Sequence, residues 1–229
     1  MNFPEEKLIG KYGLEIGGPS NMFRKEGLFP LYRLIDRLDG CNFSDYTIWE
    51  GDLTEGNNYQ YEDEKTGKQY ICDVVKLSSK IKSKTYDFVL SSNCIEHIAN
   101  PLQAIQECQK VIKIGGVLLI IVPKKDRNFD HKRSVTLFSH IEEDYKYKVG
   151  EDNLFHLDEI LKLHDLPMDP PAGNLKQFKD RSLQNYTNRA LHHHVFDMDL
   201  LFKIYDFFKL KVLFTKDLGN DFLIIGEKI

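Results

Sequence analysis

The sequence predicts an α/β fold, in which one domain of 229 residues is built on a mostly parallel sheet and a further segment is inserted late in the chain. Two observations predict it. Residues 13–18 are an apolar stretch that ends in two glycines. This is typical of a buried strand that ends in a turn where the backbone approaches a ligand closely. Residues 85–125 then read as strand, helix and strand, which is a βαβ unit with a right-handed crossover.

Composition narrows the class of protein. The net charge of −4 gives no electrostatic case for a nucleic acid or an anionic membrane as partner. The first six residues lack the features of a signal peptide, and the apolar run at 117–122 is too short to span a bilayer, so we expect a soluble cytoplasmic protein without a membrane partner. The four cysteines are widely spaced, which predicts neither disulfides nor a cysteine zinc site.

The first turn reads G-L-E-I-G-G-P-S over residues 13–20. Gly17 and Gly18 allow a backbone to approach a ligand closely, and Pro19 suits the first turn of a helix because that amide needs no partner. The stretch lacks G-x-G-x-x-G, and no Lys or Thr follows the glycines. A nicotinamide-binding fingerprint and a P-loop are therefore both disfavoured.

The next fifty residues are less regular. Gly27 and Pro30 interrupt the pattern, so any first helix is short. Asp39 comes 24 residues after Glu15, and it is either the acid that meets ribose hydroxyls at the end of a second strand or a turn aspartate. Residues 42–70 suggest two or three short extended pieces, and a clearer strand end precedes Asp73.

The block from 85 to 125 is the most informative. Residues 86–92 form a strand that leaves into small polar residues, and Asn100 and Pro101 are an N-cap and a first helical residue. Apolar residues then recur at helical spacing until Gly115 and Gly116 stop the helix. The run at 117–122 does not alternate, which is typical of a strand covered on both faces.

Together, G-L-E-I-G-G-P-S and the string YDFVLSSNCIEHIANPLQAIQECQKVIKIGGVLLIIVPK resemble the class I S-adenosylmethionine-dependent methyltransferases, of the type-11-like methyltransferase-domain family. The resemblance implies a Rossmann-like sheet of seven strands, mostly parallel with an antiparallel last strand, and S-adenosyl-L-methionine as cofactor. Pro19 stands where the motif has its second glycine, so a non-catalytic binding module of the same fold is the alternative.

The resemblance also implies cofactor contacts. Glu15 would face the methionine end of the cofactor, usually indirectly, and an acid at the place of Asp73 contacts the adenine amino group. The full set of expected cofactor residues is Glu15, Gly17, Gly18, Asp39, Asp73, Ser92 and Asn93.

Some seventy residues, 124–195, separate the βαβ unit from the tail. They leave from the carboxyl end of a strand, where open α/β sheets bind ligands, so we expect an inserted substrate-recognition lid. Arg133, Arg189 and His193 are its candidate substrate contacts, because they could bind a carboxylate, a phosphate or sugar hydroxyls. After the lid, a helix from 196 to 208 and two antiparallel strands, at 211–214 and 222–225, complete the sheet.

The resemblance points to a small acceptor with a hydroxyl group, a sugar or glycan precursor, and to O-methylation. Removing the hydroxyl proton calls for a base, and histidine suits that task near neutral pH. His97 is the first candidate, with a structural histidine that bonds its own loop as the other interpretation, and His131 is the second candidate.

Residues 192–194 are three consecutive histidines, which raises the question of a metal. Consecutive side chains alternate along a strand or fan around a helix, so three in a row seldom converge on one ion. His131, Glu142, Glu143 and Asp144 are the possible remote ligands, but they follow no spaced ligand motif. We therefore expect no metal site.

Overall fold

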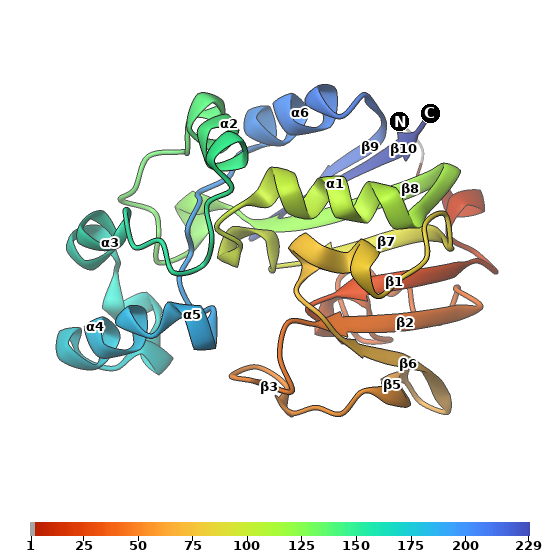
Figure 1. Ribbon diagram of the computed structural model, residues 1–229, viewed down its shortest axis with the longest axis horizontal. Coiled ribbons are helices and arrows are strands. Elements are labelled where there is room, and N and C mark those ends of the chain that lie inside the picture. Colours follow the sequence, from red (N-terminus) through yellow and green to blue (C-terminus); the bar gives the residue numbers. More distant parts are fainter. Residues whose placement is uncertain (1–2) are drawn as a thin grey trace.

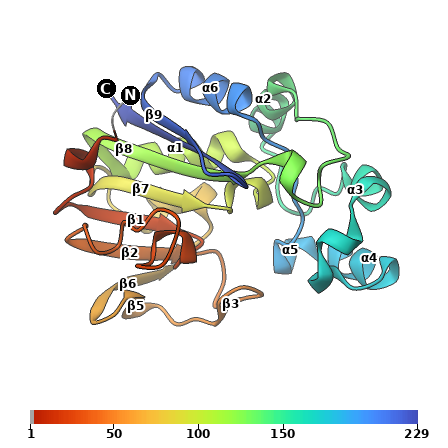
Figure 2. The ribbon, with the colours of Figure 1, turned by 180° about the vertical axis from the view of Figure 1, so that it is seen from behind.

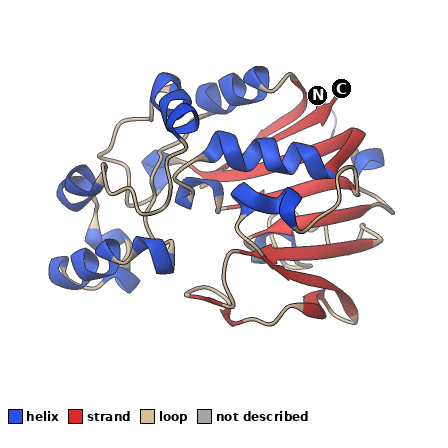
Figure 3. Ribbon diagram, viewed as in Figure 1, coloured by secondary structure: helices blue, strands red, loops and turns tan. Residues whose placement is uncertain are grey.

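The computed structural model describes residues 3–229, and its centre is an eight-stranded sheet in the order β5-β6-β2-β1-β7-β8-β10-β9 (Figures 1 and 3). The strands are β1 (Tyr12–Ile16), β2 (Arg37–Asn42), β5 (Gly56–Glu62), β6 (Lys65–Ile71), β7 (Tyr86–Ser92), β8 (Ile112–Pro123), β9 (Leu210–Asp217) and β10 (Asp221–Lys228), with a separate hairpin of β3 (Tyr46–Thr47) and β4 (Gly51–Asp52).

The helices follow the same order along the chain. The α-helices are α1 (Pro101–Val111), α2 (Phe138–Tyr147), α3 (Leu157–Leu163), α4 (Leu175–Leu183), α5 (Asn185–Asn188) and α6 (Met198–Phe207). The 3-10 turns are η1 (Glu5–Lys7), η2 (Asn21–Phe23), η3 (Val74–Ser79), η4 (Ile95–His97), η5 (Lys125–Arg127), η6 (Leu166–Met168) and η7 (Pro170–Ala172).

The predicted strand directions are confirmed. β1 pairs in parallel with β2 and β7, and β7 pairs in parallel with β8. β10 runs antiparallel to both β8 and β9, as expected for the last strand. The sheet has one strand more than the seven predicted, because β5 folds back antiparallel on β6 and extends the edge.

The two faces of the sheet are covered by different parts of the chain. On one face lie η3, α1 and α6, and α1 begins as predicted, with the Asn100 side chain accepting from the amide of Gln103. The other face, seen in Figure 2, is packed mainly by residues 3–35, whose short η2 is the only helical turn between β1 and β2 in the described residues. Residues 117–122 of β8 are buried between the two layers, as predicted.

The inserted segment lies beyond the carboxyl ends of the central strands (Figures 1 and 2). It carries α2 to α5 and has a small apolar cluster of its own, formed by Ile160, Ala172, Phe178 and Leu191. Within residues 3–229, no helix has the length and apolar character needed to cross a membrane.

Candidate active site

A cavity of about 680 Å³ lies between the carboxyl ends of the central strands and the inserted segment. Its wall combines the first turn, the ends of β2, β6 and β7, and residues of the insert. The residues that matter for its chemistry are Gly17, Asn42, Trp49, Asp73, Ser92, Asn93, Glu96, His97, Arg189 and His192.

Neighbouring side chains pack tightly against the two glycines of the first turn. Gly17 has a φ of +77°, and a Cβ there would lie 2.8 Å from Cys94 Sγ. A Cβ on Gly18 would lie 2.3 Å from the carboxyl carbon of Glu15 and 2.4 Å from the Tyr59 hydroxyl. Gly17 lines the cavity whereas Gly18 does not, so only the first glycine offers its backbone to a ligand there.

Glu15 supports this turn from beneath and does not line the cavity. Its Oε1 accepts from the Ser20 amide at 3.1 Å, and its Oε2 accepts from the hydroxyls of Tyr32 and Tyr59 at 2.6 and 2.7 Å. Burial raises the pKa of Glu15 to about 7, although these three hydrogen bonds favour the ionised form. Any influence of Glu15 on a ligand therefore passes through the turn that it holds.

The structure corrects the expectation for Asp39. It is the third residue of β2, fully buried, and lies outside the cavity lining. Its oxygens accept from Tyr12, Tyr86 and the Lys68 amide. It is thus neither a turn residue nor free to bind a ribose. Asn42, which ends β2, lines the cavity instead, and its Nδ2 donates to the carbonyl of Gly18 at 3.0 Å.

Asp73 joins the core to the insert. It follows β6 and caps η3, with Oδ1 accepting from the Val75 amide. Its Oδ2 accepts from Arg189 at 2.9 Å, and the same guanidinium lies 2.9 Å from Glu151 Oε1. Arg189 is therefore an ion-pair bridge at the cavity wall.

Ser92 is the last residue of β7, Asn93 follows it, and both line the cavity. Asn93 has a left-handed backbone with a φ of +48°, and its Nδ2 donates to Asp221 Oδ1 at 3.0 Å. This bond ties the loop after β7 to the start of β10.

Two imidazoles face the cavity from different elements. His97, at the end of η4, has Nδ1 3.1 Å from the carbonyl of Leu191, so Nδ1 is the donor and Nε2 keeps its lone pair. His192 has Nδ1 2.5 Å from Asp130 Oδ2, which likewise leaves Nε2 for a ligand. The two rings meet edge to face at 4.5 Å, and Trp49 packs on His97 at 5.0 Å.

The two histidines differ in basicity. Burial lowers the pKa of His97 well below its ordinary value. Burial also acts against a charge on His192, but the Asp130 carboxylate outweighs it, so the pKa of His192 is raised. Asp130 is itself held by the buried guanidinium of Arg133 at 3.0 Å.

Glu96 lies beside these rings and is almost fully buried. Burial raises its pKa to about 7, and its Oε2 has no hydrogen-bond partner among residues 3–229. Three side chains here, those of Glu96, His97 and His192, each offer one ligand atom, and these atoms lie within 4.8 Å of one another. This part of the cavity wall could therefore hold a cation.

The other residues singled out in the sequence lie outside the cavity lining. His131 pairs with Asp165 at 2.6 Å, and Arg133 donates to the carbonyls of His192 and His193. His193 contacts Asn185 and Glu151. Of the three expected substrate contacts, only Arg189 lines the cavity. His192 was missed because no local periodicity tells which of three consecutive histidines faces inward.

Comparison with known proteins identifies the fold. Residues 36–120 match the sequence model of a family described as a methyltransferase domain. This match covers less than half of the chain, and it supports the resemblance to the class I S-adenosylmethionine-dependent methyltransferases. No curated protein matches this methyltransferase in sequence. The suggestion of a non-catalytic module, which Pro19 raised, is set aside, and the cofactor of the enzyme is S-adenosylmethionine.

Solved structures share the fold at low sequence identity. A putative Zn-dependent alcohol dehydrogenase from Rhodobacter sphaeroides is 13% identical, with a TM-score of 0.54 over 99% of the methyltransferase and 88% of that chain. The N-methyltransferase NodS from Bradyrhizobium japonicum is 11% identical, with a TM-score of 0.52 over 97% and 88%. The CurJ carbon methyltransferase is 13% identical with a TM-score of 0.47 over 96% of this chain, which spans 49% of the length of that protein.

Proposed function

We propose that this methyltransferase transfers the methyl group of S-adenosylmethionine to a hydroxyl of a small polar acceptor of the sugar or glycan-precursor class. The observation that carries the proposal is the pairing of His192 with Asp130 in the cavity wall, since it leaves a basic imidazole nitrogen directed away from its carboxylate. A hydroxyl needs such a base because its proton must leave as the methyl group arrives.

The cofactor would lie along the carboxyl ends of the strands, where open α/β sheets bind ligands. The backbone at Gly17 has no side chain to obstruct the methionine part. Asn42 stands at the end of β2 for the ribose, and Asp73 stands after β6 for the adenine amino group, each in the cavity wall. Ser92 and Asn93 would border the reacting end.

The cofactor supplies an activated methyl group on a sulfonium, so the protein's task is to align the acceptor and remove one proton. The acceptor oxygen forms a bond to the methyl carbon while the carbon–sulfur bond breaks, and the hydroxyl proton passes to His192 Nε2. The products are a methyl ether and S-adenosylhomocysteine, and the Asp130 carboxylate stabilises the imidazolium that forms.

His192 is a better base than His97, because a pKa near the working pH gives both the right protonation state and enough basicity. The low pKa of His97 keeps its Nε2 as a hydrogen-bond acceptor. We assign His97 the task of orienting the acceptor hydroxyl. His131, the second base candidate from the sequence, lies outside the cavity lining.

The composition of the wall supports a sugar-like acceptor. Phe43, Trp49 and Phe129 supply apolar surface, and Asn128 and Arg189 supply directional donors. A molecule with flat apolar faces and several hydroxyls satisfies both kinds of surface. A purely apolar acceptor would leave the polar groups unpaired, which costs binding free energy.

The test is a panel of acceptors incubated with the purified enzyme and S-adenosylmethionine, with S-adenosylhomocysteine release as readout. We expect turnover with monosaccharides or glycosides and a methyl ether in the product. In His192→Ala, kcat should fall by about 10²–10⁴, with unchanged cofactor affinity, whereas His131→Ala should retain wild-type kcat. Turnover with amines alone, or full kcat in His192→Ala, would contradict the proposal.

A further inference from the structure

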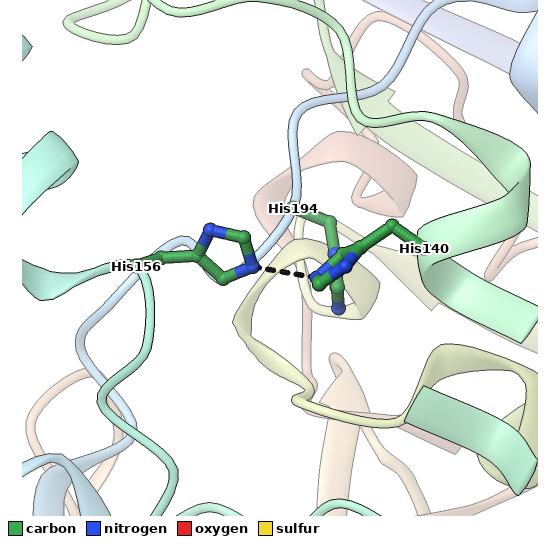
Figure 4. A group of neighbouring side chains, drawn as sticks. All are labelled: His140, His156 and His194. Atoms are coloured by element: carbon green, nitrogen blue, oxygen red, sulfur yellow. Dashed lines mark hydrogen bonds between the residues drawn. The ribbon is translucent and has the colours of Figure 1, made fainter. Parts of the chain in front are cut away.

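A second histidine cluster lies outside the cofactor cavity, where three segments of the chain meet. His140 is in the first turn of α2, His156 directly precedes α3, and His194 is in the stretch that leads from the insert back to α6 (Figure 4). Each ring offers one nitrogen, and these nitrogens lie within 4.8 Å of one another.

The distances are close to those of a tetrahedral metal site. His140 Nε2 lies 2.8 Å from His156 Nε2 and 3.3 Å from Asp144 Oδ2, and His194 Nε2 lies 3.6 Å from the same oxygen. Four ligands at the usual zinc bond length of about 2.0–2.1 Å stand roughly 3.3 Å apart. The three imidazoles are therefore close enough to share one ion, with the Asp144 carboxylate beside two of the rings.

An unsatisfied atom supports the same conclusion. His194 is 1% exposed, and its Nδ1 has no hydrogen-bond partner among the described residues, while its Nε2 lies 3.1 Å from the carbonyl of Ala99. A buried polar atom without a partner costs free energy, so a missing ligand is a natural explanation. Because Nε2 donates to this carbonyl, Nδ1 carries the lone pair that could bind an ion.

The surroundings suit a cation. A small cavity of about 200 Å³ borders all three histidines and both Glu143 and Asp144, which gives an ion a route to the cluster. Within the part of the chain that the structure describes, neither lysine nor arginine lines this cavity.

We propose that His140, Asp144, His156 and His194 bind one divalent transition-metal ion, with Zn²⁺ as the best match, and that the ion clamps the insert to the core. Three imidazoles and a carboxylate are typical zinc ligands. The ion joins α2, the start of α3 and the segment before α6. The three consecutive histidines, from which we expected no metal, do not reveal this site because only His194 belongs to it.

The proposed metal site is connected to the cofactor cavity through His193 and Glu151. His193, next to His194, contacts Glu151, and Glu151 pairs with Arg189 in the cavity wall. Fixing His194 therefore fixes the chain on which the bridge to Asp73 depends. The ion has a structural task, distinct from the reaction assigned to His192.

The test is metal binding by the purified full chain. The protein is stripped with a chelator, titrated with Zn²⁺ and analysed for bound metal, and Co²⁺ serves as a spectroscopic probe of tetrahedral geometry. We expect one equivalent of Zn²⁺, tetrahedral Co²⁺ absorption and a melting temperature about 5–10 °C higher at a hundredfold excess over Kd. These signals should be lost in the double variant His140→Ala/His156→Ala, whose two side chains are partly exposed and tolerate truncation.

Two controls separate this site from others. His131→Ala removes a histidine of the same insert that is outside the cluster, and it should bind Zn²⁺ like the wild type. His192→Ala tests the other group of donors, at Glu96 and His97. No stoichiometric Zn²⁺ in the wild type, or loss of binding in His192→Ala with retention in the double variant, would overturn the proposal. Circular dichroism confirms that each variant is folded before titration.

Discussion

The guanidinium of Arg189 lies 2.9 Å from Asp73 Oδ2 and also 2.9 Å from Glu151 Oε1, so one side chain of the insert joins two acids that are 78 residues apart in the sequence. All three side chains are largely buried. The relationship matters because Asp73 is our proposed contact for the adenine amino group. The insert therefore closes on the residue that we propose as the adenine contact.

Replacing Arg189 should destabilise the protein far more than replacing an exposed partner. Arg189→Ala leaves Asp73 and Glu151 without a counter-charge, and we expect a loss of about 3 kcal/mol in urea unfolding. The matched control is Lys176→Ala, which removes the exposed pair with Asp180 and should cost less than about 0.5 kcal/mol. Equal losses in the two variants would show that the bridge has no special role.

Gly17→Ala should weaken cofactor binding at least about tenfold, a change of about 1.4 kcal/mol. The new Cβ meets Cys94 Sγ at 2.8 Å, and the left-handed backbone adds strain. Gly10→Ala is the control, because Gly10 has a φ of +66° but no atom within 4 Å of its Cβ. Isothermal titration with S-adenosylhomocysteine should therefore separate the two variants, although both lose about 1 kcal/mol of stability from backbone strain.

The elements that the sequence predicts well are those with local signals. The helix α1 has its cap, its proline and its apolar face within residues 100–112, and β8 has an apolar run that only a doubly covered strand needs. The extent of β2 is not evident from the sequence, because Asp39 and Gly40 are residue types typical of turns. Gly40 is in the strand, and a Cβ there would lie 2.1 Å from the ring of Tyr59. The absence of a side chain at Gly40 makes room for Tyr59, which is distant in the sequence, so the local sequence does not reveal this contact.

The site was predictable only where it follows from strand ends. Gly17, Asp73, Ser92 and Asn93 all lie at or just after the ends of strands, and all line the cavity. The positions of the side chains that the insert contributes depend on how this irregular segment folds back onto the sheet. No periodicity in the sequence specifies that path. His192, His193 and His194 consequently face Asp130, Glu151 and the second histidine cluster, respectively.

Glu15 should make stability depend on pH. Its pKa is about 7 in the folded protein, against an ordinary value of 4.5, because burial disfavours the charge. A raised carboxyl pKa stabilises the fold below pH 4.5, and this contribution is lost as the pH rises through 7. In Glu15→Gln the group is neutral throughout, so the wild type should lose up to about 3 kcal/mol relative to the variant between pH 5 and pH 8.

Urea unfolding of both proteins at the two pH values gives this difference, and the other titrating groups cancel in it. Glu50→Gln is a suitable comparison, because Glu50 is only partly buried and burial raises its pKa as well. A stability difference between wild type and Glu15→Gln that does not change with pH would contradict an ionisation near neutral pH.

Asp130→Asn should change the pH profile of methyl transfer. The Asp130 carboxylate raises the pKa of His192, and an amide in its place supplies no charge to stabilise the imidazolium. Since the base must be unprotonated, kcat/KM of the wild type falls as the pH drops through the pKa of His192. In the variant this acidic limb should move to lower pH by about one unit or more, and the plateau should fall at least about tenfold because the base is weaker.

The measurement is kcat/KM from pH 5 to pH 9 with the acceptor identified in the panel. Asp165→Asn is the matched control, since it alters the equivalent partner of His131 outside the cavity and should leave the limb in place. An unshifted limb in Asp130→Asn, together with an unchanged plateau, would mean that His192 does not accept the proton. A lower plateau without any shift would assign Asp130 a positioning role, because orientation changes the rate while charge changes the pKa.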